Sequence, residues 1–208
     1  MVIAEGEKVK LRPIEPADFP KIVAWTNDPE VSQFIEGEYP QTLAECPAWL
    51  AASRRDRHNQ RFTITDRTGR VIGDIELDHI TWRSGDAEMR VRIGERELWD
   101  QGYGSDAVCA LLVHAFGRMR LHRIYLRVFR QNQRAIRCYQ KCGFRKEGRI
   151  VRPGPDGKPV EVILMRILRD EFERRRRRGL IPAPGAARTQ DRTAAAESSR
   201  RGKSRLAG

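Results

Sequence analysis

A glycine-bearing loop between a predicted strand and a long predicted helix constrains the fold of this chain most strongly. Residues 87–93 alternate between apolar and charged side chains, which predicts a strand with one buried face. The loop follows at 94–104. Apolar residues then recur at four-residue steps from Ala107, with Ser105 as the expected N-cap, which predicts an amphipathic helix. The order strand, loop, helix indicates an α/β fold.

The end of this loop, Gln101-Gly102-Tyr103-Gly104-Ser105-Asp106, has the features of a phosphate-binding turn. Glycines let a backbone approach a ligand closely, and the first turn of the following helix offers unpaired N–H groups and the positive end of the helix dipole. Neither the GxxxxGK[ST] pattern of a P-loop nor the GxGxxG pattern of a dinucleotide site occurs here. By itself the Gly-x-Gly pair is equally typical of a tight structural turn.

The rest of the chain predicts more strands and helices in alternation. Gly143 is expected to end the last of the internal helices, as a glycine just past a helix end should. This mixture favours a sheet with helices on its faces. Strands are expected at 9–12, 61–65, 71–80, 122–129, 144–151 and 160–168, and helices at 16–25, 42–51 and 133–141.

Composition limits the class of protein. The 208 residues, 39% of them hydrophobic, suffice for one substantial core, and no run approaches the roughly 18 apolar residues of a membrane helix. Charge begins at Glu5, so no secretory signal is expected and the protein should be cytoplasmic, with no membrane association. The four cysteines lack zinc-ligand spacing, so we expect free thiols and no metal; a disulfide or metal site at Cys138 and Cys142 is the alternative.

The net charge of +12 is concentrated at one end of the chain. Residues 169–208 carry 12 of the 40 basic residues and only 5 of the 28 acidic ones. We expect a charged helix at 169–181 and a disordered basic tail at 182–208, which is rich in Ala, Gly, Ser, Pro and Arg. Such a tail can contact RNA or the ribosome without reading sequence, or it can serve only as a solvated segment.

Several separated motifs resemble those of the GNAT family of N-acetyltransferases. Residues 101–105 resemble its Q/R-x-x-G-x-G/A acetyl-CoA signature, and 132–144 are similar to its N-x-x-A-x-x-x-Y-x-K-x-G-F segment. Residues 11–13 and 25–31 are similar to the RimJ/RimL-like branch of ribosomal-protein and spermidine acetyltransferases. The resemblance spans residues 8–168 and implies a single GNAT domain there, with a mixed central sheet of about six or seven strands flanked by helices.

The resemblance implies that acetyl-CoA is the co-substrate and that its acetyl group passes to a primary amine by direct attack in a ternary complex. The acceptor would be a protein N-terminus or a small-molecule amine. The family splays its sheet at the strand 87–93, so that free backbone there holds the pantetheine arm and the thioester carbonyl. The implied coenzyme-binding residues are Arg92, Ile93, Gln101, Gly102, Tyr103, Gly104, Ser105, Asp106 and Asn132.

Acetyl transfer to an amine needs a base for the protonated amine, donors for the oxyanion and an acid for the leaving thiolate. Glu88 matches the glutamate that is the base in some GNAT enzymes, but an ion pair with Arg90 or Arg92 is an equal alternative. Tyr139 stands at the family's acid position, with a core tyrosine as the alternative. Cys138 is expected to face away from whatever Tyr139 faces.

The acceptor is the least constrained part of the hypothesis. Arg90 and Arg92 stand where many relatives carry glycine and an aromatic residue. On an acceptor pocket they would suit an acidic substrate and disfavour a polyamine; alternatively they pair with Glu88 or Asp74. The pocket itself is expected from about residues 25–60. A non-catalytic GNAT-fold module that docks to the ribosome or RNA through its basic tail is the second hypothesis, and monomer and homodimer both remain open.

Overall fold

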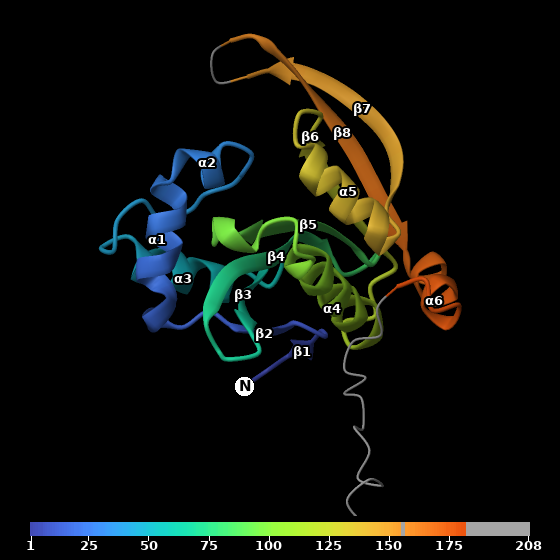
Figure 1. Cartoon of the computed structure of the whole chain (residues 1–208), viewed down its shortest axis with the longest axis horizontal. Coiled ribbons are helices and arrows are strands. Elements are labelled where there is room, and N and C mark those ends of the chain that lie inside the picture. Colours follow the sequence, from blue (N-terminus) through green and yellow to red (C-terminus); the bar gives the residue numbers. More distant parts are fainter. Residues whose placement is uncertain (155–156, 182–208) are drawn as a thin grey trace, which may run out of the picture.

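A single sheet of eight strands runs through the computed structural model, which describes residues 1–154 and 157–181 (Figure 1). Its strand order is β1-β2-β3-β4-β5-β6-β8-β7. This is one strand more than the upper end of the expected range, because the two-residue β1 folds back and pairs Ala4 with Leu11. The strands are β1 Ala4–Glu5, β2 Val9–Pro13, β3 Gln60–Asp66, β4 Val71–Thr81, β5 Asp86–Ile93, β6 Arg123–Phe129, β7 Arg145–Pro153 and β8 Pro159–Leu168.

The pairing between β5 and β6 sets the position of the site. Every other neighbouring pair of strands is antiparallel, whereas β5 and β6 are parallel and pair only over Asp86–Glu88 and Arg123–Tyr125. Beyond these residues the two strands diverge. The sheet therefore splays at its centre, as the family resemblance implied. Figure 1 shows the hairpin of β7 and β8 extending away from the rest of the sheet.

Most helices match predicted ones, with shifts at several starts, but the short helix at 29–32 was not predicted. The predicted helix 16–25 begins as a single 3-10 turn, Pro16–Asp18, before α1. The predicted helix 42–51 begins only at Cys46, because the Glu45 carboxylate accepts hydrogen bonds from the Gln41 N–H and the Thr42 hydroxyl and holds that segment as a turn. The helices are α1 Phe19–Asn27, α2 Pro29–Ser32, α3 Cys46–Arg55, α4 Tyr103–Gly117, α5 Gln133–Cys142 and α6 Arg169–Arg177.

Helix α4 lies in the main hydrophobic core, and a smaller cluster lies under α1 and α3. Residues 107–112 are all almost fully buried, so α4 is covered on nearly every side rather than along one stripe. The smaller cluster packs Ile22 and Trp25 of α1 against Leu50 of α3. Removing such apolar surface from water is the main stabilising contribution to the fold.

The predicted charged helix at 169–181 is found as α6, and it is docked on the core. Phe172 is buried and its ring lies 5.5 Å from that of Phe116. The predicted tail at 182–208 and residues 155–156, between β7 and β8, lie outside the described residues. Within the described part of the chain, no helix has both the length and the apolar character needed to cross a bilayer.

The ends of two helices test the predicted caps. Gly143 ends α5 in the left-handed conformation, with φ 99°, as expected. At α4 the prediction was wrong: Gly102, with φ 86°, is the N-cap, and Ser105 is the third helical residue. The left-handed backbone at Gly102 turns the chain into the helix three residues earlier than predicted, and the Ser105 hydroxyl donates back to the Gly102 carbonyl at 2.9 Å.

Candidate active site

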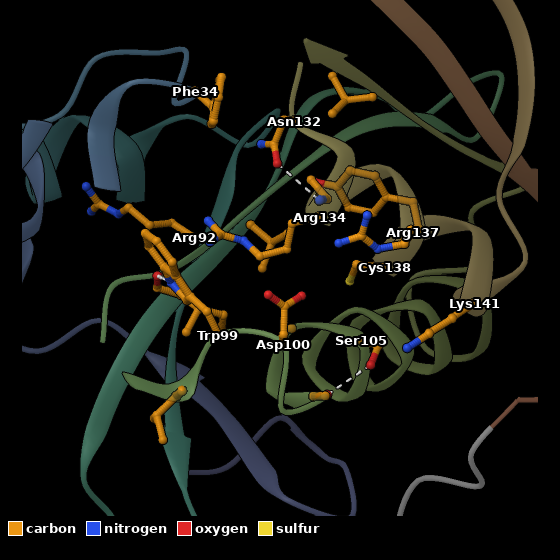
Figure 2. A pocket seen from close by; sticks show the side chains of 18 of the residues that line it. Phe34, Arg92, Trp99, Asp100, Ser105, Asn132, Arg134, Arg137, Cys138 and Lys141 are labelled. Atoms are coloured by element: carbon orange, nitrogen blue, oxygen red, sulfur yellow. Dashed lines mark hydrogen bonds between the residues drawn. The ribbon is translucent and has the colours of Figure 1, made fainter. Parts of the chain in front are cut away.

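A cleft lies between the diverging strands β5 and β6 and is flanked by the first turn of α4 and one face of α5 (Figure 2). Its empty volume of about 1050 Å³, open mouth included, is large enough for a cofactor-sized ligand. We call it the coenzyme cleft. Its lining includes Val91, Arg92, Ile93, Gly102, Gly104, Ser105, Arg127, Asn132, Arg134, Arg137, Cys138, Tyr139 and Lys141.

The first turn of α4 presents free backbone donors to this cleft. The first backbone hydrogen bond of the helix runs from the Asp106 N–H to the Gly102 carbonyl at 3.0 Å. The N–H groups of Tyr103, Gly104 and Ser105 precede it and have no acceptor within the helix. A Cβ atom at Gly104 would stand 3.6 Å from the Cys138 sulfur, an ordinary contact, so glycine is not required there by packing. The absence of a Cβ atom at Gly104 leaves the backbone there open to a ligand.

Asp106 does not belong to this surface, and its prediction as a coenzyme contact is corrected. Its carboxylate accepts hydrogen bonds from the backbone N–H groups of Glu7, Lys8 and Val9, at 2.9, 2.8 and 3.0 Å. Its own N–H is used inside α4. A side chain at Gly6 would collide with this carboxylate. Asp106 therefore fixes the turn between β1 and β2 against the start of α4.

Gln101 and Tyr103 contact Lys8, a residue that the sequence analysis missed. The Lys8 ammonium donates to the Gln101 carbonyl at 2.7 Å and lies 5.3 Å from the centre of the Tyr103 ring. The Gln101 side chain donates to the Glu97 carbonyl, and neither Gln101 nor Tyr103 is part of the cleft lining, so a coenzyme contact there would use their backbone N–H groups. Lys8 also adds a positive charge beside the loop. No sequence motif links it to a loop more than 90 residues away.

Three cations on α5 face the first turn of α4. Figure 2 shows Arg134, Arg137 and Lys141 projecting from one side of α5 toward the loop and Ser105. The guanidinium of Arg134 stacks on Trp99, 3.5 Å from the ring centre, and burial lowers the pKa of Arg134 despite the opposing effect of Asp100. Their spacing along a helix was the available signal, but it is equally typical of a solvated face. Cations opposite free N–H groups suit phosphate.

The splay leaves one edge of β5 without a strand partner. Pairing with β6 stops at Glu88, and farther along β5 the residues Val91, Arg92 and Ile93 line the cleft. The Arg92 side chain is buried away from it, so only the backbone at this position is available to a ligand. This is the arrangement that the predicted contacts at Arg92 and Ile93 require. Asn132 lines the same cleft and caps α5, its side-chain oxygen accepting from the Ala135 N–H at 3.1 Å.

Tyr139 lies where the coenzyme cleft meets an adjoining cavity and lines both. It is buried and packs on Phe144, with 5.8 Å between ring centres. Burial raises the pKa of Tyr139 above its ordinary value, and the thiols of Cys138 and Cys142 act in the same direction, so the hydroxyl holds its proton at neutral pH. Cys138 also lines the cleft, against expectation, so neighbouring positions of α5 reach the same cleft.

Glu88 is held by cations at the point where the strands separate. Its two oxygens accept from Nε and Nη2 of Arg127, each at 2.8 Å, and Arg90 adds a contact at 3.5 Å. The ion-pair alternative is thus present, although its main partner is on β6 and not on Glu88's own strand. A carboxylate has further lone pairs, so this pairing leaves room for a water at Glu88. Its role as a base stays a prediction.

The arginines that suggested an acidic acceptor are paired. Arg92 donates to Asp74 through Nε at 2.8 Å, and its Nη2 lies 2.7 Å from the same carboxylate oxygen. Arg90 donates to Glu76 at 3.0 Å and to Asp78 at 2.8 Å. The alternative of internal ion pairs is therefore what the structure shows. Neither guanidinium is free to receive a substrate carboxylate or phosphate.

The four cysteines are free thiols, and no cluster of three or more His, Cys, Asp or Glu side chains within residues 1–154 and 157–181 has the arrangement of a metal site.

A glycine-capped helix start, a facing row of cations and an unpaired strand edge together define a protein that binds a long phosphate-bearing coenzyme across a splayed sheet.

Comparison with known proteins identifies the class further. The family model of the acetyltransferase (GNAT) domain matches residues 8–145. The chain belongs to the GNAT acetyltransferase family, whose members are acyltransferases that use acetyl-CoA. The match covers the splayed strands, the loop and all of α5.

Individual relatives agree with this assignment. The chain is 27% identical over 146 residues to a spermidine N(1)-acetyltransferase of Vibrio cholerae serotype O1, covering 70% of this chain and 84% of the relative. It is 28% identical over 190 residues to an aminoglycoside N(6')-acetyltransferase type 1 of Serratia marcescens, covering 85% and 91%. The solved structure of spermidine N-acetyltransferase from Vibrio cholerae with CoA and spermine has a TM-score of 0.73 at 26% identity, covering 79% of this chain and 98% of that one.

Proposed function

We propose that this enzyme transfers the acetyl group of acetyl-CoA to a primary amine by direct attack in a ternary complex. The observation that carries the proposal is the junction of two cavities at Tyr139. Tyr139 lines both the coenzyme cleft and the adjoining cavity, which also share Phe34, Ile35, Val91, Arg127 and Val128. Two substrates can therefore meet at Tyr139 without either one leaving first.

The coenzyme's phosphates would be held at the start of α4. The N–H groups of Tyr103, Gly104 and Ser105 would donate to the diphosphate, and the cations of α5 would supply charge complementarity. The pantetheine arm would lie along the unpaired edge of β5, near Asn132. Backbone N–H groups at Arg92 or Ile93 would donate to the thioester carbonyl and to the oxyanion that forms there during attack.

Tyr139 would protonate the departing thiolate. Because its hydroxyl keeps its proton at neutral pH, it is a donor throughout the working range. Glu88, acting through a water, would accept the proton that the ammonium of the acceptor must lose before attack. The relatives named as spermidine and aminoglycoside acetyltransferases support amine acetylation as the reaction class.

A screen of primary amines, monitored by free thiol release from acetyl-CoA, tests the proposal. We expect turnover with at least one acceptor and intersecting lines when both substrate concentrations are varied, as a ternary complex requires. Parallel lines would indicate an acetyl-enzyme and contradict direct attack. Failure of the folded protein to bind CoA in calorimetry would contradict the catalytic proposal itself.

The second hypothesis, docking to the ribosome or RNA, depends on the segment 182–208, which lies outside the described residues. A chain ending at residue 181 separates the two hypotheses. An enzyme should retain turnover on a small amine, whereas a docking module should lose its partner.

A further inference from the structure

The cavity that adjoins the coenzyme cleft is lined by both apolar and charged side chains. It opens between the segment that follows α2 and the divergence of β5 from β6. Because it shares Tyr139 with the coenzyme cleft, it is the acceptor cavity of the proposed reaction. Its apolar lining is Phe34, Ile35, Met89, Val91, Val128, Phe129 and Val162, and its charged lining is Glu36, Glu88, Arg90 and Arg127.

Arg90 lines this cavity, and carboxylates surround its guanidinium as they would surround a bound cationic ligand. One guanidinium nitrogen donates to Glu76 and to Asp78, at 3.0 and 2.8 Å, and the other lies 3.5 Å from Glu88. Only 16% of the side chain is exposed. A side chain at Gly37 would stand 3.5 Å from the guanidinium, so the segment after α2 lies over it. Three carboxylates thus surround one internal cation.

The remaining carboxylates around the cavity have arginine partners of their own. Glu88 is held by Arg127. Arg61 lies 2.9 Å from Glu76, on the side away from the cavity lining. Glu36, at the cavity mouth, pairs with Arg152 of β7. Within the described residues, each carboxylate that lines the cavity or contacts Arg90 therefore faces a guanidinium, and none is left for a second positive charge on a substrate.

We infer that Arg90 determines the acceptor class: the enzyme acetylates an amine carried on an apolar or uncharged body and rejects polyamines. The inference rests on the proposed function, because it assigns the acceptor of the same site. A distal ammonium would have to leave water for a cavity whose carboxylates already have arginine partners, Arg90 among them. A neutral or aromatic body would instead cover the apolar lining. By excluding a second cation, Arg90 would make the enzyme select against polyamines.

Three acceptors of equal chain length test this. Hexylamine, 1,6-diaminohexane and 6-aminohexanoate differ only in the distal group, which is neutral, cationic or anionic. For the wild type we expect kcat/KM to be highest for hexylamine and at least about tenfold lower for 1,6-diaminohexane, with spermidine lower still. Equal or faster turnover of the diamine or of spermidine would overturn the inference.

Arg90→Met keeps the aliphatic stem and removes the charge. The three carboxylates then keep only two guanidinium partners, Arg61 and Arg127, which leaves a site for one cation. We expect the preference for hexylamine over the diamine to fall by about tenfold or more, and millimolar guanidinium to restore it. Arg61→Met is the matched control, because it removes a charge from the same network without opening the cavity. Its acceptor preference should equal that of the wild type.

A binding measurement separates this inference from the proposed function. Calorimetry with 1,6-diaminohexane, in the absence of acetyl-CoA, should detect binding to Arg90→Met and none to the wild type or Arg61→Met. If this binding is detected but no amine supports turnover, the proposed reaction is contradicted, whereas the role of Arg90 in excluding a second cation is supported. A folded Arg90→Met protein that binds no diamine overturns the inference. Arg90→Gln, which retains hydrogen bonding, serves the same purpose if the methionine variant does not fold.

Discussion

Glu88 of β5 and Arg127 of β6 are joined by two hydrogen bonds of 2.8 Å across the gap in the sheet. Glu88 is also the last residue of β5 that pairs with β6 through the backbone, so this ion pair bridges the strands where they begin to diverge. Both residues line the acceptor cavity, which Tyr139 also lines. It therefore combines a structural contact with the position of the predicted base.

The two roles of Glu88 predict different outcomes for matched variants. If Glu88 is the base, Glu88→Gln should lower kcat by roughly 100-fold and remove the acidic limb of the pH–rate profile, because no carboxylate is left to accept the proton. Arg127→Met keeps the carboxylate and should retain most of the activity. Steady-state kinetics across pH measures both. Equal losses in the two variants at every pH would show that only the ion pair matters.

Replacing Tyr139 with phenylalanine removes the proposed proton donor and little else. The ring packs on Phe144, and the variant keeps this contact, so the fold should be kept. We expect kcat to fall by about 100-fold with no change in CoA affinity, measured by calorimetry. Tyr125→Phe, on β6 and outside the coenzyme cleft, is the control and should be fully active. Undiminished turnover in the Tyr139 variant would exclude it as the acid.

Gly104→Ala should weaken coenzyme binding without destabilising the protein. The added Cβ has ordinary contacts with Cys138 and Ile93, but it projects into the cleft where the diphosphate is expected. We expect KM for acetyl-CoA to rise by roughly tenfold. Gly117→Ala, at the other end of α4 with nothing within 4 Å, should leave KM unchanged. Both should be as stable as the wild type or more so, by about 1 kcal/mol, in urea unfolding. Unchanged KM at position 104 would place the phosphates elsewhere.

The cations of α5 predict a salt-dependent contribution to coenzyme binding. Arg137→Gln should raise KM for acetyl-CoA by about fivefold at low ionic strength, and the difference from wild type should shrink as salt screens the charges. Arg149→Gln, an exposed arginine on β7, removes the same charge outside the cleft and should have no such effect. A KM ratio between variant and wild type that stays constant from low to high salt would argue against phosphate contact.

Asp18 predicts how stability depends on pH. Burial alone would raise the pKa of Asp18, but hydrogen bonds from Arg12, the Glu15 N–H and Thr63 outweigh it and hold the pKa below its ordinary value of 3.8. A carboxylate whose pKa is lowered by folding stabilises the fold at pH values above its pKa in the unfolded chain. This stabilisation is lost as the pH falls through its pKa in the folded protein.

Asp18→Asn should therefore cost about 3 kcal/mol of unfolding free energy at neutral pH, because it leaves Arg12 without its partner. The gap between wild type and variant should close below about pH 4. Urea unfolding at a series of pH values measures this. A gap that persists unchanged at pH 3 would mean that the charge of Asp18 is not what stabilises the fold.

Local sequence patterns predicted most strands and helices and the loop that we propose binds the coenzyme. The alternation of 87–93, the glycines at 102 and 104 and the glycine at 143 act through the backbone conformation of their own neighbourhoods, so periodicity and turn chemistry reveal them. Even there, the exact start of α4 was misplaced, because a serine and a left-handed glycine are both acceptable helix caps.

Which charges meet depends on how distant segments pack. Asp106 meets backbone donors that are 97 to 99 residues away, and Glu88 meets Arg127, 39 positions away, more closely than it meets Arg90 of its own strand. The same holds for Arg90, which satisfies three carboxylates of which two lie on β4. Local patterns specify which face a side chain takes, whereas the partner it finds depends on which strand or turn is packed against that face. For this reason the sequence pointed to a coenzyme, and the fold pointed to the kind of acceptor.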